Sequence, residues 1–363
     1  MKRLLKILGV LLLLAILFLV YDLSTIGTFR SIENSYQGSI ERYDIPGAED
    51  FAMSREDGFM IISSDDRAGR RDGKDVVSGL YYMDLHTKEI TPLITSREMA
   101  IYPHGIHMLR LDSTQHRLLV VNHITESTEG VSSLDIHAVH SIEEFILEGK
   151  SLRHIKSHKD DLVFSPNDVV GVDDTRFYYT NDHGSKTSLG LQLEDLLGFK
   201  RSNVGYFDGS KYRIVAEDIA YANGINIDHS KDILFVASPR HVKVIPYNIK
   251  EDGSLDKIEE IPCKSGVDNI EMGPDGKLWI GSHPKALLTL PYFAGTRAYS
   301  PSEIITIDYR GKGDYDVKSI YESDGVDMSA STVALPYKDK IYIGCVMDDH
   351  FIALDAGGMR NME

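Results

Sequence analysis

The pattern of hydrophobic and polar positions after residue 30 repeats one short unit six times. Each unit has a short apolar segment, a polar turn, and a second apolar segment that ends in small or polar residues. The units span residues 50–64, 108–123, 168–183, 224–239, 269–283 and 331–346. Apolar runs that flank a polar turn in this way are typical of antiparallel hairpins.

The spacing of the units predicts the architecture. Their starts lie 45 to 62 residues apart, a length that a four-stranded antiparallel sheet and its loops occupy. Repeated units of this kind bury their sheet faces against one another. We therefore predict an all-β domain over residues 31–363, a six-bladed β-propeller with four-stranded blades. A sandwich of unrelated hairpins is the alternative. The one helix expected after residue 30 is a short one around Glu143–Leu147.

The N-terminal segment is apolar and should form a hydrophobic helix. Residues 7–21 carry no charge and follow Lys2, Arg3 and Lys6. A helix of this length rises roughly 22 Å, somewhat less than the ~30 Å hydrocarbon core of a bilayer. A cleaved secretory signal and an uncleaved anchor both fit, and the lack of a good small-x-small cleavage site favours the anchor. Basic residues before the span favour a cytoplasmic N-terminus, so residues 1–30 would hold the propeller on the extracytoplasmic side of the membrane.

Charge and composition exclude several classes of protein. The chain has 363 residues, with 55 Asp and Glu against 39 Lys and Arg, and a formal net charge of −16. Because a protein this acidic repels the phosphates of nucleic acids, we expect no nucleic-acid partner. The same negative charge favours the binding of metal cations. The two cysteines are too few for a disulfide-rich scaffold or a Cys-ligated zinc module.

Acidic and amide residues recur where the first strand of a unit begins. They are Glu49 with Asp50, Asn167 with Asp168, Asn223, and Asp268 with Asn269. One such residue alone is most often a turn residue. Residues at the same position of each repeat lie at the same height along the propeller axis and at the same distance from it. These side chains should therefore converge at one mouth of the central tunnel. With no Lys or Arg nearby they would repel one another unless a cation joined them, and calcium prefers such oxygen ligands.

Histidine supplies a second candidate for chemistry. The chain has 14 His, and a lone His is more often structural than catalytic. His104 is the exception, because it precedes the second unit where other units have their acids and amides. It should reach the same mouth and can act as a general base on water. His123, His183 and His283 each end the second strand of a unit.

Seven short motifs follow one another along the chain. They are YPHGI at 102–106, SPND at 165–168, YTNDH at 179–183, ANGIN at 222–226, VDNI at 267–270, GSHP at 281–284 and STVA at 331–334. Together they resemble the paraoxonases, the calcium-dependent arylesterases and lactonases, over roughly residues 30 to 360. The resemblance implies a six-bladed propeller with two calcium ions in its tunnel. An uncleaved hydrophobic N-terminus is also common in that family.

The resemblance implies a role for each candidate residue. An upper, catalytic calcium would be bound by Glu49, Asn167, Asn223, Asp268 and Asn269. A deeper, structural calcium would be bound by Asp50, Asp168 and the backbone carbonyl of Ile106. The family's histidine pair would be His104 and His123. The candidate pocket residues are His183, Tyr221, His283, Val346 and Met347.

The chain departs from the family in two places. The family closes its propeller with a disulfide, but here the C-terminal position is Ala353 and no Cys precedes Cys263. We therefore predict closure by strand pairing alone, with Cys263 and Cys345 as buried thiols. The segment 65–71 is polar where the family is more apolar. The substrate preference of the family is therefore the property that the resemblance predicts least well for this chain.

The predicted function is calcium-dependent hydrolysis of small-molecule esters and lactones. Calcium would polarise the carbonyl, His104 would take a proton from the attacking water, and His123 would hold or relay it. One alternative is a sugar-lactone (gluconolactonase-like) hydrolase with a single metal, which the polar segment around Asp66 and Arg67 would favour. The other is a non-catalytic, membrane-tethered propeller that binds a partner and uses calcium for structure only.

Overall fold

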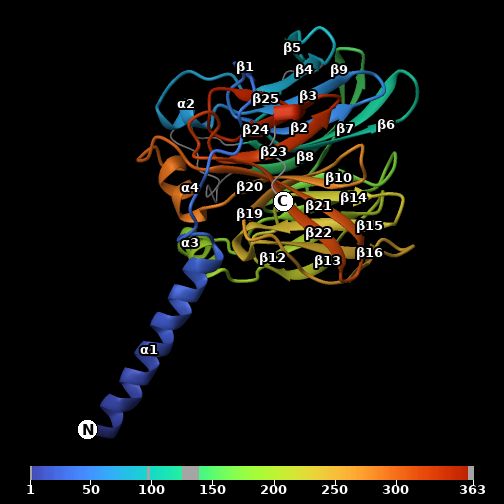
Figure 1. Ribbon diagram of the computed structural model, residues 1–363. Coiled ribbons are helices and arrows are strands. Elements are labelled where there is room, and N and C mark those ends of the chain that lie inside the picture. Colours follow the sequence, from blue (N-terminus) through green and yellow to red (C-terminus); the bar gives the residue numbers. More distant parts are fainter. Residues whose placement is uncertain (1, 96–98, 125–138, 359–363) are drawn as a thin grey trace.

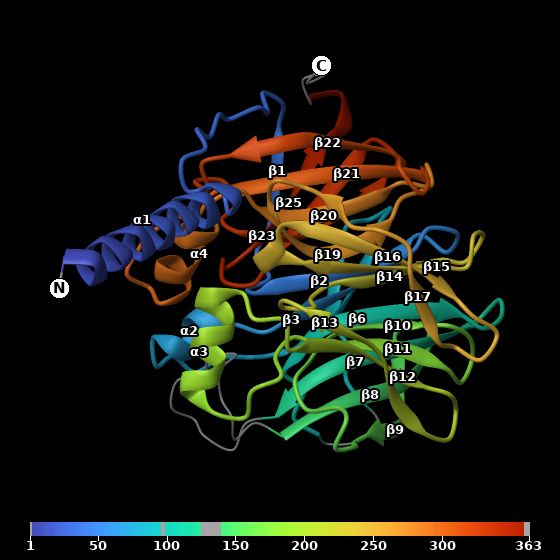
Figure 2. The ribbon, with the colours of Figure 1, turned by 90° about the horizontal axis from the view of Figure 1, so that it is seen from below.

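The computed structural model describes residues 2–95, 99–124 and 139–358. Six antiparallel sheets surround a central axis, so the predicted six-bladed β-propeller is confirmed (Figures 1 and 2). Each of the six predicted hairpins forms the two innermost strands of one blade. Neighbouring innermost strands contact one another around the whole ring, including the last with the first.

The first three blades run outward from the axis in chain order. Blade one consists of β2 (Ala48–Ser54), β3 (Phe59–Ser64), β4 (Gly79–Asp84) and β5 (Ile90–Pro92). Blade two consists of β6 (Pro103–Arg110), β7 (Gln115–Ile124), β8 (Val139–Glu148) and β9 (Ser151–His158). Blade three consists of β10 (Pro166–Gly171), β11 (Phe177–Asn181), β12 (Ser202–Phe207) and β13 (Tyr212–Ile219).

The last three blades include two variations. Blade four consists of β14 (Ile225–Asp228), β15 (Ile233–Ser238), β16 (Lys243–Ile249) and an outer strand split into β17 (Leu255–Lys257) and β18 (Ile261–Pro262). Blade five consists of β19 (Gly266–Met272), β20 (Leu278–His283), β21 (Ser302–Gly311) and β22 (Asp314–Ser323). Blade six consists of β23 (Ser331–Tyr337), β24 (Lys340–Cys345), β25 (Phe351–Asp355) and, as its outer strand, β1 (Ile40–Tyr43) from the N-terminal side.

Strand pairing between β1 and β25 closes the ring, as predicted. The register runs from Ile40 opposite Leu354 to Tyr43 opposite Phe351, and the last two rings stack with centroids 4.8 Å apart. Both cysteines are buried free thiols. The hydrophobic core lies between neighbouring blades, where the alternating apolar residues of one sheet pack on the next.

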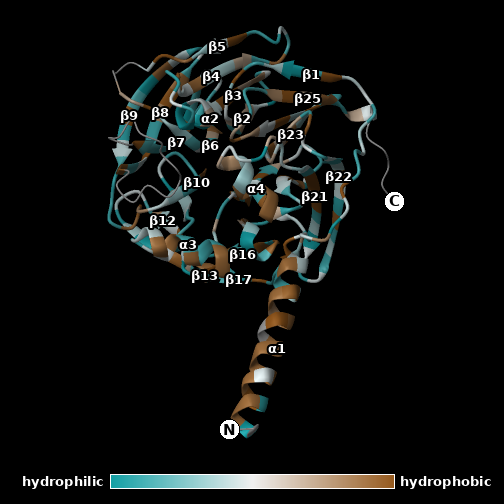
Figure 3. Ribbon diagram, turned by 90° about the vertical axis from the view of Figure 1, so that its left-hand side faces the viewer, coloured by the Kyte–Doolittle hydropathy of each residue, from teal (hydrophilic) through white to brown (hydrophobic). Residues whose placement is uncertain are grey.

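Helices gather at one end of the propeller (Figures 1 and 3). They are α2 (Arg67–Arg71), α3 (Ser188–Leu197) and α4 (Ala286–Phe293), with a short 3₁₀ turn at η1 (Pro239–His241). The 3₁₀ turn η2 (Ala356–Gly358) follows β25 and lies beside the turn between β23 and β24, where Ala356 N–H donates to the carbonyl of Asp339. The sequence does not indicate these helices, because each is shorter than the windows in which helical periodicity is evident. The N-terminal helix α1 (Lys2–Thr25) projects from this same end, and Figure 3 shows it hydrophobic along most of its length. Its Arg3–Thr25 portion is long and apolar enough to cross a membrane.

The predicted helix at Glu143–Leu147 is wrong, because this segment lies within the strand β8. Phe145 and Leu147 alternate into the core between blades one and two. Glu144, which precedes Phe145, is paired with Arg117 of the neighbouring strand, with an Oε1–Nε distance of 2.7 Å. The buried pairing of an acidic residue across strands explains why a segment that appears helical in sequence is extended.

The residues that follow the predicted membrane segment contact the propeller. Asp22 accepts two hydrogen bonds from the guanidinium of Arg240, at 3.1 and 2.9 Å. Ile26 is buried, and the guanidinium of Arg30 binds the carboxylates of Glu303 and Glu322. The base of α1 is therefore attached to the propeller by both charge and apolar contact.

Candidate active site and metal centre

The predicted upper ligands are buried together where the innermost strands begin. Asn269 Nδ2 donates to Glu49 Oε1 at 2.9 Å, although the two residues belong to different blades. Glu49 Oε2 lies 3.1 Å from His104 Nδ1, and His104 Nε2 lies 3.1 Å from Asn167 Nδ2. One polar network thus joins residues of blades one, two, three and five, and His104 lies within it as its phase predicted.

Close backbone contacts between blades make this convergence possible. A side chain at Gly105 would collide with Asp168 and with the backbone of Asn167 in the next blade. A side chain at Gly224 would likewise meet the backbone of Asn269. Glycine at these two positions therefore lets adjacent blades approach at the tunnel mouth.

Four oxygens at this mouth are fully buried and have no hydrogen-bond partner in the part of the chain that the structure describes. They are Glu49 Oε2, Asn167 Oδ1, Asn223 Oδ1 and Asn269 Oδ1. An unsatisfied buried oxygen is costly, and four at one mouth require a common explanation. All four belong to the predicted calcium ligands, so the donor set fits a hard cation that takes oxygen ligands. The fifth predicted ligand, Asp268, has one oxygen 2.8 Å from Nε2 of His283.

The donor set is unlike a zinc site. Within residues 2–95, 99–124 and 139–358, no group of three or more His, Cys, Asp and Glu side chains has the arrangement of a metal site. The candidate set takes three of its five side chains from Asn, so its oxygens lie outside any such group. Amide and carboxylate oxygens without Cys or coordinating His are typical of calcium rather than of zinc.

The predicted deeper ligands lie next along the same strands and link neighbouring blades. Asp50 accepts hydrogen bonds from the backbone N–H of Phe51 at 2.9 Å and of Ile106, in blade two, at 2.7 Å. Asp168 accepts from Val169 at 2.7 Å and from Ile225, in blade four, at 2.8 Å. Each carboxylate therefore bridges two blades and still has lone pairs to offer a cation.

Burial and mutual repulsion act on these carboxyl groups. Burial, followed by the charge of Asp168, raises the pKa of Asp50 well above its usual range, and burial likewise raises the pKa of Asp168. Glu271 on β19 belongs to the same group, because burial and then the charge of Asp168 raise its pKa strongly. Glu271 was not among the predicted ligands; it lies two positions after Asn269. A cation at this level would relieve the repulsion.

The two predicted catalytic histidines are neighbours. The rings of His104 and His123 pack edge to face with centroids 5.1 Å apart. His123 Nε2 donates to the carbonyl of Pro166 at 2.7 Å. Burial, followed by repulsion from His104 and His140, lowers the pKa of His123 well below its usual range. His123 is therefore neutral at pH 7, with its proton on Nε2.

An arginine also enters the site, contrary to the expectation that no Lys or Arg lies near the acids. Arg67 opens α2, and its Nη2 lies 2.9 Å from Nδ1 of His104. Because a guanidinium only donates, Nδ1 accepts this hydrogen bond. That explains why Glu49 Oε2, also close to Nδ1, receives none. The only indication in the sequence was that segment 65–71 is polar. No local pattern reveals that this segment contacts His104.

The candidate pocket residues divide into two groups. His183 lies between Asp182 and Asp195, at 2.8 and 2.9 Å. Burial alone would lower the pKa of His183, but these carboxylates raise it to about 10. Tyr221 packs against it, with ring centroids 4.9 Å apart. These contacts, with that of His283 to Asp268, place His183, Tyr221 and His283 around the mouth. The buried Val346 and half-buried Met347 follow β24, and no hydrogen bond joins them to the network.

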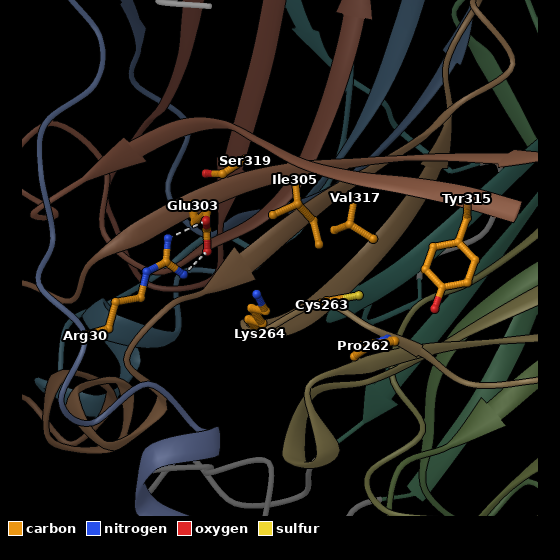
Figure 4. Close-up of a pocket in the computed structure, with 9 residues that line it drawn as sticks. All are labelled: Arg30, Pro262, Cys263, Lys264, Glu303, Ile305, Tyr315, Val317 and Ser319. Carbon is orange, nitrogen blue, oxygen red and sulfur yellow. Dashed lines mark hydrogen bonds and ion pairs between the residues drawn. The ribbon is translucent and has the colours of Figure 1, made fainter. Parts of the chain in front are cut away.

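A separate cavity lies away from this network. It has a volume of about 430 Å³ and lies between blades four and five, where Arg30 meets Glu303 (Figure 4). Apolar side chains, including Ile305 and Val317, form much of its wall. The orphaned oxygens and His104 do not line it.

Comparison with known proteins supports one family. The Arylesterase family profile matches residues 69–353. Serum paraoxonase/arylesterase 1 of Homo sapiens is 31% identical, with 73% of each chain covered. Serum paraoxonase/arylesterase 2 of Gallus gallus is 30% identical, with 74% of each covered. Among solved structures, a luciferin-regenerating enzyme superposes with a TM-score of 0.55 at 11% identity, covering 89% of this chain and 97% of its own, and shares the fold. The chain belongs to the arylesterase family of carboxylic-ester hydrolases.

Proposed function

We propose that this protein hydrolyses esters and lactones in a calcium-dependent reaction at the tunnel mouth. The observation that carries the proposal is the set of four orphaned buried oxygens beside His104. A metal site that only stabilised the fold would not need a histidine next to its metal ligands. The names of the relatives, paraoxonase and arylesterase, agree with a small-molecule ester substrate.

In this proposal the upper calcium is held by Glu49, Asn167, Asn223, Asp268 and Asn269. When bound, such an ion polarises a carbonyl and stabilises the negative charge that develops on its oxygen. A deeper, structural calcium is held by Asp50, Asp168 and the carbonyl of Ile106. Since these carboxylates already bridge blades, its main effect is on stability.

The chain's own residues move the proton. His104 takes a proton from the attacking water at Nδ1, once Nη2 of Arg67 has moved off the lone pair that it occupies in the structure. A base is needed because calcium acidifies water less than zinc does. His123 is neutral and fixed by Pro166, so it packs against His104 and holds the ring in place. Glu49 Oε2, 3.1 Å from Nδ1, stabilises the imidazolium that forms. His104 then returns the proton to the departing alkoxide.

We further propose that residues 1–30 anchor residues 31–363 to a membrane, with the propeller on the extracytoplasmic side. The exposed apolar length of α1 and the basic residues Lys2, Arg3 and Lys6 before it support this orientation. Because α2, α3 and α4 lie at the end from which α1 projects, the active site would face the membrane side of the propeller (Figure 3).

The test is hydrolysis of phenyl acetate and δ-valerolactone by the full chain in detergent micelles. We expect turnover with calcium, loss with a chelator, and recovery on adding calcium back. Asn223→Ala should lower the calcium affinity of the activity, because Asn223 contributes one of the orphaned oxygens. Turnover that persists after complete removal of calcium would contradict the proposal. No turnover of any ester or lactone with calcium bound would favour a binding protein.

A further inference from the structure

Arg67 lies beside His104, the proposed base, and shares the carboxylate of Asp65 unequally with Arg70. Asp66 caps α2 by accepting from the backbone N–H of Gly69 at 2.7 Å, which places Arg67 at the start of the helix. Asp65 accepts from both terminal nitrogens of Arg70 and from Ser78. Its only contact with Arg67 is to Nε, at a longer 3.3 Å.

The charges of Glu49 and Asp65 act on Arg67, but neither carboxylate hydrogen-bonds its terminal nitrogens in the described residues. Two guanidinium groups, those of Arg67 and Arg70, share the one carboxylate of Asp65, and Arg70 takes most of its capacity. Arg70 is further held by stacking on Tyr102, with its guanidinium carbon 4.8 Å from the ring centre. The Nη1 group of Arg67 has no hydrogen-bond partner in the described part of the chain, and the side chain remains 19% exposed.

The partner that Nη2 does have is an uncharged one. The bond from Nη2 to His104 Nδ1 carries charge on its donor only, whereas a bond from a guanidinium to a carboxylate carries charge on both partners and can be doubled. A carboxylate that entered the mouth would therefore take both terminal nitrogens of Arg67 in the bidentate geometry that suits a guanidinium. Binding of that carboxylate would also break the hydrogen bond from Nη2 of Arg67 to Nδ1 of His104.

Hydrolysis produces such a group at this place. The bond between the acyl carbon and the alkoxy oxygen breaks, and a bond forms between the acyl carbon and the oxygen of water. The proton of water passes to His104 and then to the alkoxide, and the resulting carboxylic acid loses its proton to solvent near neutral pH. The oxygen that water delivers lies beside His104, and so beside Nη2 of Arg67, 2.9 Å from that ring.

We propose that Arg67 binds the carboxylate of the acid product, so that the mouth is a binding site for small carboxylates. The proposal rests on the proposed hydrolysis for the identity of its ligand, but binding of the ligand can be measured without turnover. It predicts that acid products inhibit the enzyme competitively, whereas neutral amides of the same shape do not. It also predicts a preference for substrates whose acyl group keeps Arg67 accessible.

The experiment measures binding of phenylacetate and of phenylacetamide to the calcium-loaded full chain by calorimetry in detergent. The two compounds have nearly the same shape and differ in charge. We expect phenylacetate to bind more tightly, and Arg67→Ala to weaken it by about 10- to 100-fold without changing the amide. Arg67→Lys should give an intermediate loss, because lysine keeps the charge but not the fork.

Arg71→Ala is the matched control, because Arg71 lies on the same helix but donates to the carbonyl of Phe293 at 3.0 Å. It should leave phenylacetate binding unchanged. Equal phenylacetate affinity in the wild type and Arg67→Ala, with both folded by circular dichroism, overturns the proposal. If the wild type hydrolyses no ester but Arg67→Ala still weakens phenylacetate, the proposed hydrolysis fails and the carboxylate site stands.

Discussion

Arg30 gives a prediction whose size follows from the structure. Glu303 and Glu322 lie directly opposite each other on β21 and β22, an arrangement in which like charges destabilise a sheet. Their side chains are only 2% and 9% exposed. Arg30 compensates both, donating to the two oxygens of Glu303 at 2.8 and 2.6 Å and to Glu322. Arg30→Ala should therefore leave two buried carboxylates without their cation.

Removing one partner of a buried ion pair costs about 3–5 kcal/mol. Arg30 is 28% exposed, so water partly replaces it, and we expect a loss of about 2–3 kcal/mol in the free energy of unfolding. In a domain of this size each kcal/mol lowers the melting temperature by roughly 2 °C, which gives a decrease of about 4–6 °C. The assay is thermal unfolding followed by circular dichroism at one fixed scan rate.

Two comparisons separate this mechanism from general damage. Arg42→Ala removes an arginine that is 51% exposed and pairs with exposed Asp44 and Asp349, so it should change little. Adding Glu322→Gln to Arg30→Ala should recover part of the loss, because one uncompensated charge disappears. Deletion of residues 1–21 should keep the wild-type melting temperature. Deletion of residues 1–30 should lower it at least as much as Arg30→Ala does, because it also removes the contacts of Asp22 and Ile26. A melting temperature of Arg30→Ala equal to that of the wild type would refute the reasoning.

Three further predictions concern the site and the buried charges. His104→Gln should lower lactone turnover by roughly 10²-fold or more with little change in calcium affinity, and near-normal turnover would remove His104 as the base. Calcium should raise the melting temperature more than magnesium, and Asp168→Ala should lower it more than Asn223→Ala, because Asp168 bridges two blades; equal melting temperatures with calcium and with chelator would contradict this. Although burial raises it, hydrogen bonds from a histidine and an arginine bring the pKa of Glu144 to about 2, below its ordinary 4.5. The difference in unfolding free energy between the wild type and Glu144→Gln should be constant above pH 4.5 and vanish as the pH falls through about 2. Urea titrations at several pH values across this range measure that difference.

The repeated part of the fold was predictable because it depends on local pattern. Each two-strand unit shows its apolar alternation and its turn directly, and a regular period of such units permits few architectures. The position of His104 followed from the same regularity, since a residue in the ligand phase must reach the ligand mouth. In the structure His104 lies beside Glu49 and Asn167.

The parts that sequence analysis missed depend on contacts between distant segments. Arg67 reaches His104 only because blade two follows blade one around the axis, and nothing within residues 65–71 indicates it. Glu144 appears to belong to a helix until its pairing with Arg117 is known. Glu271 is one acid among many in an acidic chain, and its proximity to Asp168 comes from the narrow tunnel. In each case a charged side chain acquires the neighbour that matters to it through tertiary structure.

The network at the mouth also helps explain how this propeller closes without a disulfide. Glu49 of blade one receives hydrogen bonds on its carbonyl from Thr332 of blade six at 2.6 Å and from Asn269 of blade five at 3.2 Å. These bonds lie at the seam that β1 and β25 close farther out, so the ring is joined at both its inner and outer radius. Asp50 and Asp168 make similar links between other blades. The residues proposed to bind calcium are thus the residues that join the blades, and occupancy of the metal sites should stabilise closure of the ring as well as permit catalysis.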